Sequence, residues 1–185
     1  MAVTVLRRIN AGARLHRIHG KSLDPVFFGP AGSPLAQFDA PDGSYKVLYA
    51  ARALETSFGE TMVRSPAVPY VLSSTVQSRV RSELVVTRTL RLYPLIDAGV
   101  SKLGLSFADL HGDAYTKTWE VSGNIHATTS ADGILYTSRF DNQPCVALFD
   151  RSADAIEPAS PHSIDIAHAQ ATSLAARFGK TYVEP

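Results

Sequence analysis

The sequence predicts an α+β fold. Stretches with two-residue alternation and many β-branched residues stand beside stretches with helical periodicity, without the regular strand–helix alternation of a doubly wound sheet. The chain has 185 residues, of which 45% are hydrophobic and 19% charged, and no repeat, linker or low-complexity block divides it. Because single domains usually span about 100–200 residues, we expect residues 1–185 to form one domain.

The first half of the chain predicts two strands separated by a long loop. In the strand RLHRIHG, side-chain alternation places Leu15, Arg17 and His19 on one face. Residues 27–46 are dense in Gly, Pro, Asp and Ser, and a loop of that length within a compact domain is usually functional. The segment YKVLYAA then predicts a strand that runs directly into a helix over 52–64.

That helix carries its apolar residues on one stripe, formed by Leu54, Phe58 and Met62, which faces a core. Glu60 falls on the opposite side of the helix. Its neighbours there are the small residues Ala53, Thr56 and Ser57. Small neighbours would let a large molecule approach the Glu60 carboxylate. The simpler alternative is an exposed ion pair between Glu60 and Arg64.

The second half of the chain predicts further strands and helices. The segments VPYVLSSTVQ and ELVVTRTLRLYPLID read as two or three strands, and a strand in DGILYTSRF is expected to pair with one in PCVALFD. A short helix or turn is expected over 106–110 and a helix over 114–126. An amphipathic helix over 164–178 is closed by Gly179, and KTYVE adds an edge strand.

Composition excludes several classes of protein. The net charge is +1 and the pI about 7.9, so there is no basic excess to attract nucleic acid. The single cysteine, Cys145, lies in an apolar run, which indicates a small buried residue in a reducing compartment. The chain has no apolar stretch long enough for a secretory signal or a membrane span. We therefore expect a cytoplasmic protein.

Several short motifs resemble known binding or catalytic signatures but lack a residue that the signature requires. HGKS lacks the first glycine of a phosphate-binding loop, because that position is Leu15. GLSFA lacks the last glycine of a nucleophile elbow, and no GxGxxG is present. The six histidines form no metal-ligand pattern with carboxylates or cysteines, so no metal site is expected. His126 stays open as a site residue because it ends a helix just before a strand.

Four polar residues remain as one candidate site: Arg17, Tyr49, Glu60 and Ser138. Taken singly, each has an ordinary structural interpretation as a surface ion pair, a core aromatic or a turn residue. In order and local setting, however, they resemble the RES domain, a family named for an arginine, a glutamate and a serine. The similarity runs from LHRI through FDAPDGSYKVLYAARALETSFGET to ADGILYTSRFDNQPCVALF.

The resemblance implies a fold similar to that of ADP-ribosyltransferases and consumption of NAD+. RES proteins are typically toxins that are encoded beside a helix-turn-helix (Xre-type) antitoxin. By this resemblance the partners are NAD+ and such an antitoxin, with neither a membrane nor direct nucleic-acid binding by this chain. A homodimer within a toxin–antitoxin complex would fit the same pattern.

The resemblance also implies a role for each residue. Arg17 would bind the pyrophosphate and take part in catalysis, Tyr49 would line the nicotinamide or ribose pocket, and Glu60 would be the catalytic glutamate. Ser138 would bond an amide or ribose oxygen. Gln37 stands where many members have a second arginine, and an amide lacks the charge and the fork that suit phosphate. The cation that compensates would be Arg139, Lys46 or another residue, or else affinity for NAD+ is reduced.

This chemistry needs a fixed anion. Breaking the bond between ribose and nicotinamide builds positive charge on the ribose, as in glycoside hydrolysis, and Glu60 would stabilise that charge. Three interpretations stay open: an NAD+ glycohydrolase or phosphorylase, a mono-ADP-ribosyltransferase that modifies a protein, and a nucleotide-binding module that has lost activity. The acceptor (water, phosphate or a protein side chain) is also left open.

Overall fold

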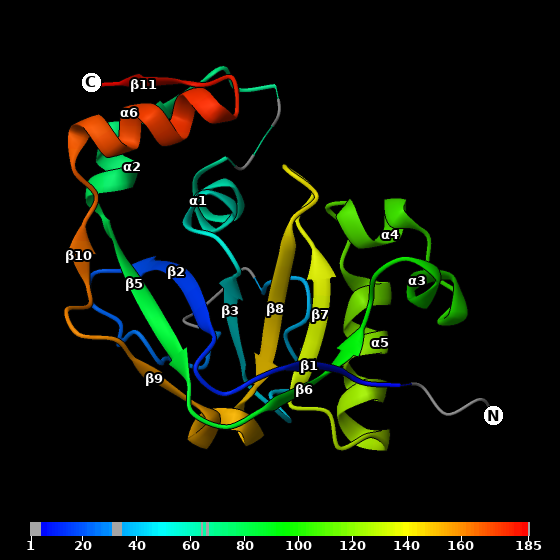
Figure 1. Ribbon diagram of the computed structural model, residues 1–185. Helices are drawn as coiled ribbons and strands as arrows, with labels where there is room; N and C mark the ends of the chain where they lie inside the picture. Colours follow the sequence, from blue (N-terminus) through cyan, green and yellow to red (C-terminus); the bar gives the residue numbers. More distant parts are fainter. Residues whose placement is uncertain (1–4, 31–34, 64, 66, 185) are drawn as a thin grey trace.

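The computed structural model describes residues 5–30, 35–63, 65 and 67–184, and Figure 1 shows their arrangement. The architecture is α+β, as predicted, with a mixed, strongly curled sheet and helices gathered at its two ends. Within the described residues, nine strands form the large sheet in the order β1-β6-β7-β8-β3-β2-β5-β10, with β9 also paired to β5. Neighbouring strands are antiparallel except for β6 and β7, which are parallel.

The strands of the large sheet are β1 (Arg7–Ile9), β2 (Arg14–Gly20), β3 (Val47–Ala51), β5 (Arg79–Val86), β6 (Leu90–Pro94), β7 (Gly133–Thr137), β8 (Pro144–Phe149), β9 (Ile156–Pro158) and β10 (Ile164–Asp165). A separate pair of parallel strands consists of β4 (Tyr70–Leu72) and β11 (Thr181–Val183). The helices are α1 (Leu54–Met62), α2 (Ser73–Gln77), α3 (Ala98–Lys102), α4 (Phe107–His111), α5 (Thr116–Thr128), α6 (His168–Arg177) and the 3-10 helix η1 (Asp150–Ala155).

The α-helices cover the sheet in two groups, and η1 lies apart from both, near β9 (Figure 1). Helices α1, α2 and α6 lie with β4 and β11 at one end, and α3, α4 and α5 lie beside β6 and β7 at the other. Phe58 of α1 packs with Ala171 and Leu174 of α6 in one apolar core. Gly59 makes this approach close, because a Cβ there would lie 2.8 Å from Cζ of Phe178. The C-terminal helix therefore backs the helix that carries Glu60.

Strand β3 is bonded differently along its two edges. Five residue pairs join it to β8, from Val47 with Phe149 to Ala51 with Cys145. On the other edge only His16 of β2 pairs with Ala51. Beyond that one pair, β2 and β3 move apart. This split in the sheet makes room for a cavity.

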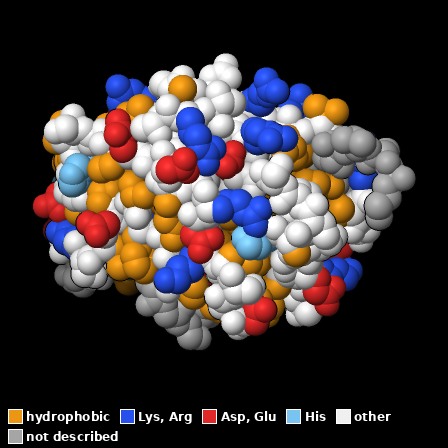
Figure 2. All heavy atoms as spheres, turned by 90° about the horizontal axis from the view of Figure 1, so that it is seen from below, with side chains coloured by type: hydrophobic (Ala, Val, Ile, Leu, Met, Phe, Trp, Pro, Cys, Tyr) orange, Lys and Arg blue, Asp and Glu red, His pale blue; other side chains and the backbone are white. Residues whose placement is uncertain are grey.

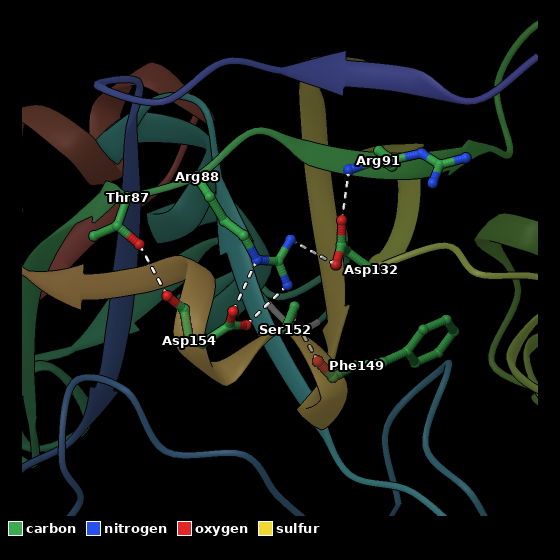
Figure 3. A network of polar contacts seen from close by, with 7 residues as sticks. All are labelled: Thr87, Arg88, Arg91, Asp132, Phe149, Ser152 and Asp154. Carbon is green, nitrogen blue, oxygen red and sulfur yellow. Dashed lines mark hydrogen bonds and ion pairs between the residues drawn. The ribbon is translucent and has the colours of Figure 1, made fainter.

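A network of hydrogen bonds and ion pairs links the turn between β5 and β6, the start of β7 and helix η1 (Figure 3). Arg88, in the turn between β5 and β6, donates to Asp132 and to both carboxylate oxygens of Asp154, with distances of 2.8–2.9 Å. The other oxygen of Asp132 accepts the backbone N–H of Arg91 at 2.8 Å. One carboxylate at the start of β7 thus ties two neighbouring segments together.

The elements agree with the predictions except in three places. SSTVQ was predicted as strand and forms α2 instead, because Ser73 and Val76 are buried with the three-residue spacing of a helix. The helix expected over 164–178 begins only at His168, since Ile164 and Asp165 pair with β5 as β10. The short strands β1 and β9, helix α3 and the 3-10 helix η1 were not predicted.

The distribution of charged side chains on the surface agrees with the small net charge of the chain. Figure 2 shows the face seen from below, on which acidic and basic side chains are interspersed among apolar ones. Such a face presents no field of a single sign to nucleic acid. None of the helices that the structure describes is long and apolar enough to cross a membrane.

Candidate active site

A cavity of about 470 Å³ opens where β2 and β3 separate. Pockets for small molecules typically measure ~300–1,000 Å³, so this one is large enough for an elongated ligand. Besides histidine, the charged side chains that line it within the described part of the chain are Arg17, Asp39, Glu60 and Arg79. The structure thus brings Arg17, Tyr49 and Glu60 to one cavity, whereas Ser138 and Gln37 do not line it.

Arg17 reaches the cavity from β2. Leu15 and His19, on the same strand face, are 0% and 2% exposed, so this face points inward as alternation predicts. Nη1 of Arg17 donates to the backbone oxygens of Pro25 (2.9 Å) and Phe27 (2.8 Å). Burial lowers the pKa of the Arg17 guanidinium to about 10, which leaves it charged at neutral pH. Arg17 therefore also fixes the chain that leads into the 27–46 loop.

Glu60 projects from α1 into the same cavity. Its Oε1 is buried and has no hydrogen-bond partner among the described residues. Burial raises the pKa of the Glu60 carboxyl above its usual value, while a side-chain hydrogen bond from Ser138 and the charge of Arg139 act in the opposite direction. In its ionised form, the Glu60 carboxylate therefore places a fixed negative charge at the cavity wall. Arg64, its alternative partner, lies outside the described residues.

Ser57, one turn before Glu60, shapes the cavity through the backbone. Its Oγ accepts the backbone N–H of Ile18 at 3.0 Å, where β2 has left β3. The neighbouring Thr56 is fully buried and donates to Asp141 at 2.8 Å. Of the small residues expected beside Glu60, Ser57 therefore lines the cavity and Thr56 anchors the helix from behind.

Tyr49 lines the cavity, and its hydroxyl bonds the 27–46 loop. The hydroxyl donates to Oδ1 of Asp39 (3.0 Å) and accepts the backbone N–H of Phe38 (2.8 Å). Burial raises the pKa of this phenol well above its usual value. Tyr49 thus joins β3 to the 27–46 loop. Helix α5 holds the same loop, because Trp119 donates to Ala36 O at 2.8 Å.

Ser138 follows β7 and is 1% exposed. Its Oγ accepts the backbone N–H of Phe140 at 3.1 Å, and its own N–H donates to Gln143 O. Its contact with the Glu60 carboxylate places it behind the cavity wall. The resemblance described above grouped Ser138 with Glu60. In the structure Ser138 contacts the Glu60 carboxylate and does not itself line the cavity.

A second, smaller cavity of about 80 Å³ lies on the other side of Glu60. Glu60 and Tyr136 line both cavities. Gln37 lines the smaller one, and its amide donates to Leu110 O. Arg139 lines it too and forms an ion pair with Asp113 at 2.8 Å.

Arg79 is a cavity residue that sequence reasoning missed. It opens β5 opposite Gly20 of β2, and its Nη1 lies 4.0 Å from where a Gly20 Cβ would be. Its side chain has no hydrogen bond or ion pair with any residue that the structure describes. Only the strand register brings it to the cavity. Of the cations considered from sequence, Lys46 is exposed and lines neither cavity.

Two further residues considered from the sequence, His126 and Cys145, take different places. His126 stacks on Tyr45 with ring centroids 4.4 Å apart and lines neither cavity. Cys145 is buried and lines the larger cavity, where burial raises the pKa of its thiol. No group of three or more metal-ligating side chains is found in the described ranges.

Comparison with known proteins gives two findings. A family model described as the RES domain matches residues 14–169. A chain of the crystal structure of the M. tuberculosis MbcT–MbcA toxin–antitoxin complex has a similar fold, with a TM-score of 0.75 and 15% identity over 91% of this chain and 92% of that chain. No curated protein matches the sequence. At 15% identity the structural similarity is evidence for the fold alone, and it confirms the predicted α+β class.

Proposed function

The chain belongs to the RES-domain family, and on that premise we propose that it is a cytoplasmic toxin that consumes NAD+ by cleaving the bond between nicotinamide and ribose. The observation that carries the proposal is the shared cavity. Arg17, Tyr49 and Glu60 line it together, and Glu60 keeps a buried oxygen without a partner among the described residues. A cation, an aromatic face and an anion are the groups that this substrate and reaction require.

The Glu60 carboxylate serves as the electrostatic stabiliser. As the bond to nicotinamide breaks, its electron pair leaves with the nicotinamide nitrogen and positive charge develops on the ribose. An anion fixed before the reaction stabilises that charge without reorganising. Ser138 holds the carboxylate, and Arg139 favours its charged form. The family's serine would thus act on NAD+ through Glu60.

Two cations serve the pyrophosphate. Arg17 is charged but already donates to two backbone oxygens through one nitrogen, which leaves its other guanidinium donors for a ligand. Arg79 lines the same cavity with its side chain unpaired in the described part of the protein. Gln37 lies in the smaller cavity, so Arg79 is the better placed substitute for the family's second arginine.

Incubation with NAD+, with and without inorganic phosphate, tests the proposed function. Release of nicotinamide with ADP-ribose would identify a glycohydrolase, and release with a ribosyl phosphate would identify a phosphorylase. Label transferred to a protein, without free ADP-ribose, would instead establish a mono-ADP-ribosyltransferase. Stoichiometric NAD+ binding without turnover would reject catalysis and leave a binding module.

We also propose that a helix-turn-helix (Xre-type) antitoxin holds the toxin inactive by covering the larger cavity. The family assignment supports this, and the similar fold in a structure described as a toxin–antitoxin complex agrees with it. Expression of the chain without a partner should slow growth and lower cellular NAD+. Normal growth and NAD+ in cells that contain folded, partner-free protein would contradict a toxin role.

A further inference from the structure

We propose that the free edge of strand β4, with the groove beside it, binds an extended segment of a partner protein. This segment carries apolar side chains at alternate positions and an acidic side chain among them. The inference does not depend on the proposed function. Four observations support it: a row of exposed apolar side chains, the bonding of β4, the small area of the patch and the charge of the groove.

Exposed apolar side chains gather on and just before β4. Among the described residues, five large apolar side chains are exposed, and three of them follow one another at alternate positions: Val68, Tyr70 and Leu72, with exposed fractions of 40%, 46% and 39%. Val71, between two of them, is buried in the core that α1 and α6 share. Single exposed apolar residues are common, but contiguous ones mark interaction sites.

A groove of about 520 Å³ lies beside this row, at the end of the molecule that holds α2 and α6 (Figure 1). Met62 at the end of α1, Tyr70 and Leu72 of β4 and Ser74 of α2 line it. It shares no described lining residue with either of the two cavities around Glu60. An occupant of this groove therefore leaves both cavities open.

The bonding of β4 determines the backbone conformation of the occupant. Strand β4 pairs in parallel with β11, and among the described strands it has no second neighbour. The backbone N–H of Thr181 donates to Pro69 O, so the odd-numbered residues direct their backbone groups to β11. The N–H and C=O of Tyr70 and the N–H of Leu72 then point to the free edge. An added strand supplies partners for these groups, whereas a helix bonds its own backbone.

The small area of the patch argues against a second copy of this chain as the occupant. A large side chain offers no more than ~250 Å², so three that are less than half exposed add at most ~350 Å². A stable interface needs ~800 Å² per partner. A short segment that adds backbone hydrogen bonds to the apolar contact needs less apolar area.

The charge of the groove determines which segment fits best. Of the described residues that line it, Lys180 alone is charged, and none carries a carboxylate. Nζ of Lys180 donates to the backbone oxygens of Ser65 (3.3 Å) and Val68 (2.5 Å), which fixes the ammonium group at the groove. A carboxylate on the partner segment is attracted to this charge, and a lysine or arginine is repelled.

Selection from a library of random twelve-residue peptides displayed on phage tests the inference with the folded chain as bait. Enriched peptides should carry apolar residues at alternate positions and Asp or Glu among them. The variant with both Tyr70→Lys and Leu72→Lys should lose the enrichment, and fluorescence anisotropy with a selected peptide should show at least about a tenfold loss of affinity. Phe107→Lys is the matched control, because Phe107 is 49% exposed and lies on α4, outside the groove. It should bind like wild type.

Methylation of single amides in the selected peptide tests the strand conformation on unaltered protein. Only every second N–H of an added strand faces β4. Every second methyl group should therefore weaken binding about tenfold, while those between should change it less than about threefold. Replacing the acidic residue of the peptide by lysine should weaken binding about fivefold at low salt and less at high salt.

Four outcomes would overturn the proposal. Selection that enriches no peptide would reject the groove as a peptide site. Equal enrichment on wild type and on the variant with both lysines would place the binding elsewhere. Methyl groups that weaken binding without a two-residue period would reject an added strand. A wild-type dimer in sedimentation equilibrium that this variant no longer forms would make a second copy the occupant.

Discussion

The two edges of strand β3 show how one element can serve both stability and function. Its edge toward β8 is paired over five residues, from Val47 to Ala51. Its edge toward β2 keeps one pair at Ala51, and Gly29 of the loop bonds Val47 at the other end. Between these two points Tyr49 faces the cavity. A sheet that is continuous on one side can therefore hold a binding site open on the other.

The largest effect is expected from removing the negative charge of Glu60, which lines the cavity between β2 and β3. Glu60→Gln keeps the size of the side chain but removes the anion, so kcat should fall by roughly 10²–10³, the scale of losing one electrostatic stabiliser. KM should change little, because neutral ground-state contacts survive. Glu55→Gln on the same helix is the control, since Glu55 lines neither cavity, and it should stay within a few-fold of wild type. An equal loss at Glu55 would contradict the assignment.

Arg17→Ala should weaken NAD+ binding by roughly 10–150-fold, because a charged hydrogen-bonded contact contributes ~1.5–3 kcal/mol. Isothermal calorimetry measures the affinity. Since Arg17 also donates to Pro25 O and Phe27 O, thermal unfolding should be recorded on the same samples. Arg17→Lys, which keeps the charge, should retain more binding than Arg17→Ala. Unchanged affinity in a folded variant would remove Arg17 from the site.

Ser57→Ala tests how the open edge is stabilised. The substitution leaves the buried N–H of Ile18 without its acceptor, which should lower the free energy of unfolding by ~1–3 kcal/mol. Denaturant unfolding measures the change. Ser74→Ala, at an exposed position in α2, should lie within about 0.5 kcal/mol of wild type. A neutral Ser57→Ala would mean that the separated strand needs no side-chain partner.

Arg79→Ala should weaken NAD+ binding about tenfold, with a smaller loss for Arg79→Lys. Nicotinamide riboside, which lacks phosphates, should bind wild type and Arg79→Ala equally. Arg81→Ala is the matched control: Arg81 lies on the same face of β5, two residues on, and does not line the cavity. Equal losses at both positions would point to a general effect of charge.

The pH profile of kcat gives the smallest expected change. Burial raises the pKa of Glu60, so activity should fall as pH drops through that raised value, at a higher pH than an ordinary glutamate near ~4.3 would give. The Ser138 hydrogen bond lowers this pKa. Ser138→Ala should therefore move the acidic limb upward. A downward shift would show that the serine does not stabilise the charged carboxylate.

Local patterns predicted the elements from which the candidate residues project, whereas their grouping into one candidate site came from the resemblance to the RES domain. The run from Tyr49 to Glu60 combines a strand, a sharp transition and a helical stripe, and all three are visible in the sequence. Arg79 could not be found in this way, because the register that sets it opposite Gly20 depends on the whole sheet. SSTVQ was misread because its β-branched residues favour a strand, whereas burial of Ser73 and Val76 favours a helix.

The packing of α6 against α1 also has a consequence for the order of events during synthesis. Phe58 and Met62 of α1 share their core with Ala171 and Leu174, and Gly59 receives Phe178. A chain still attached to the ribosome and not yet extended to position 168 therefore lacks the support behind the helix that carries Glu60. The helix that carries Glu60 therefore reaches its full packing only after that stretch has emerged.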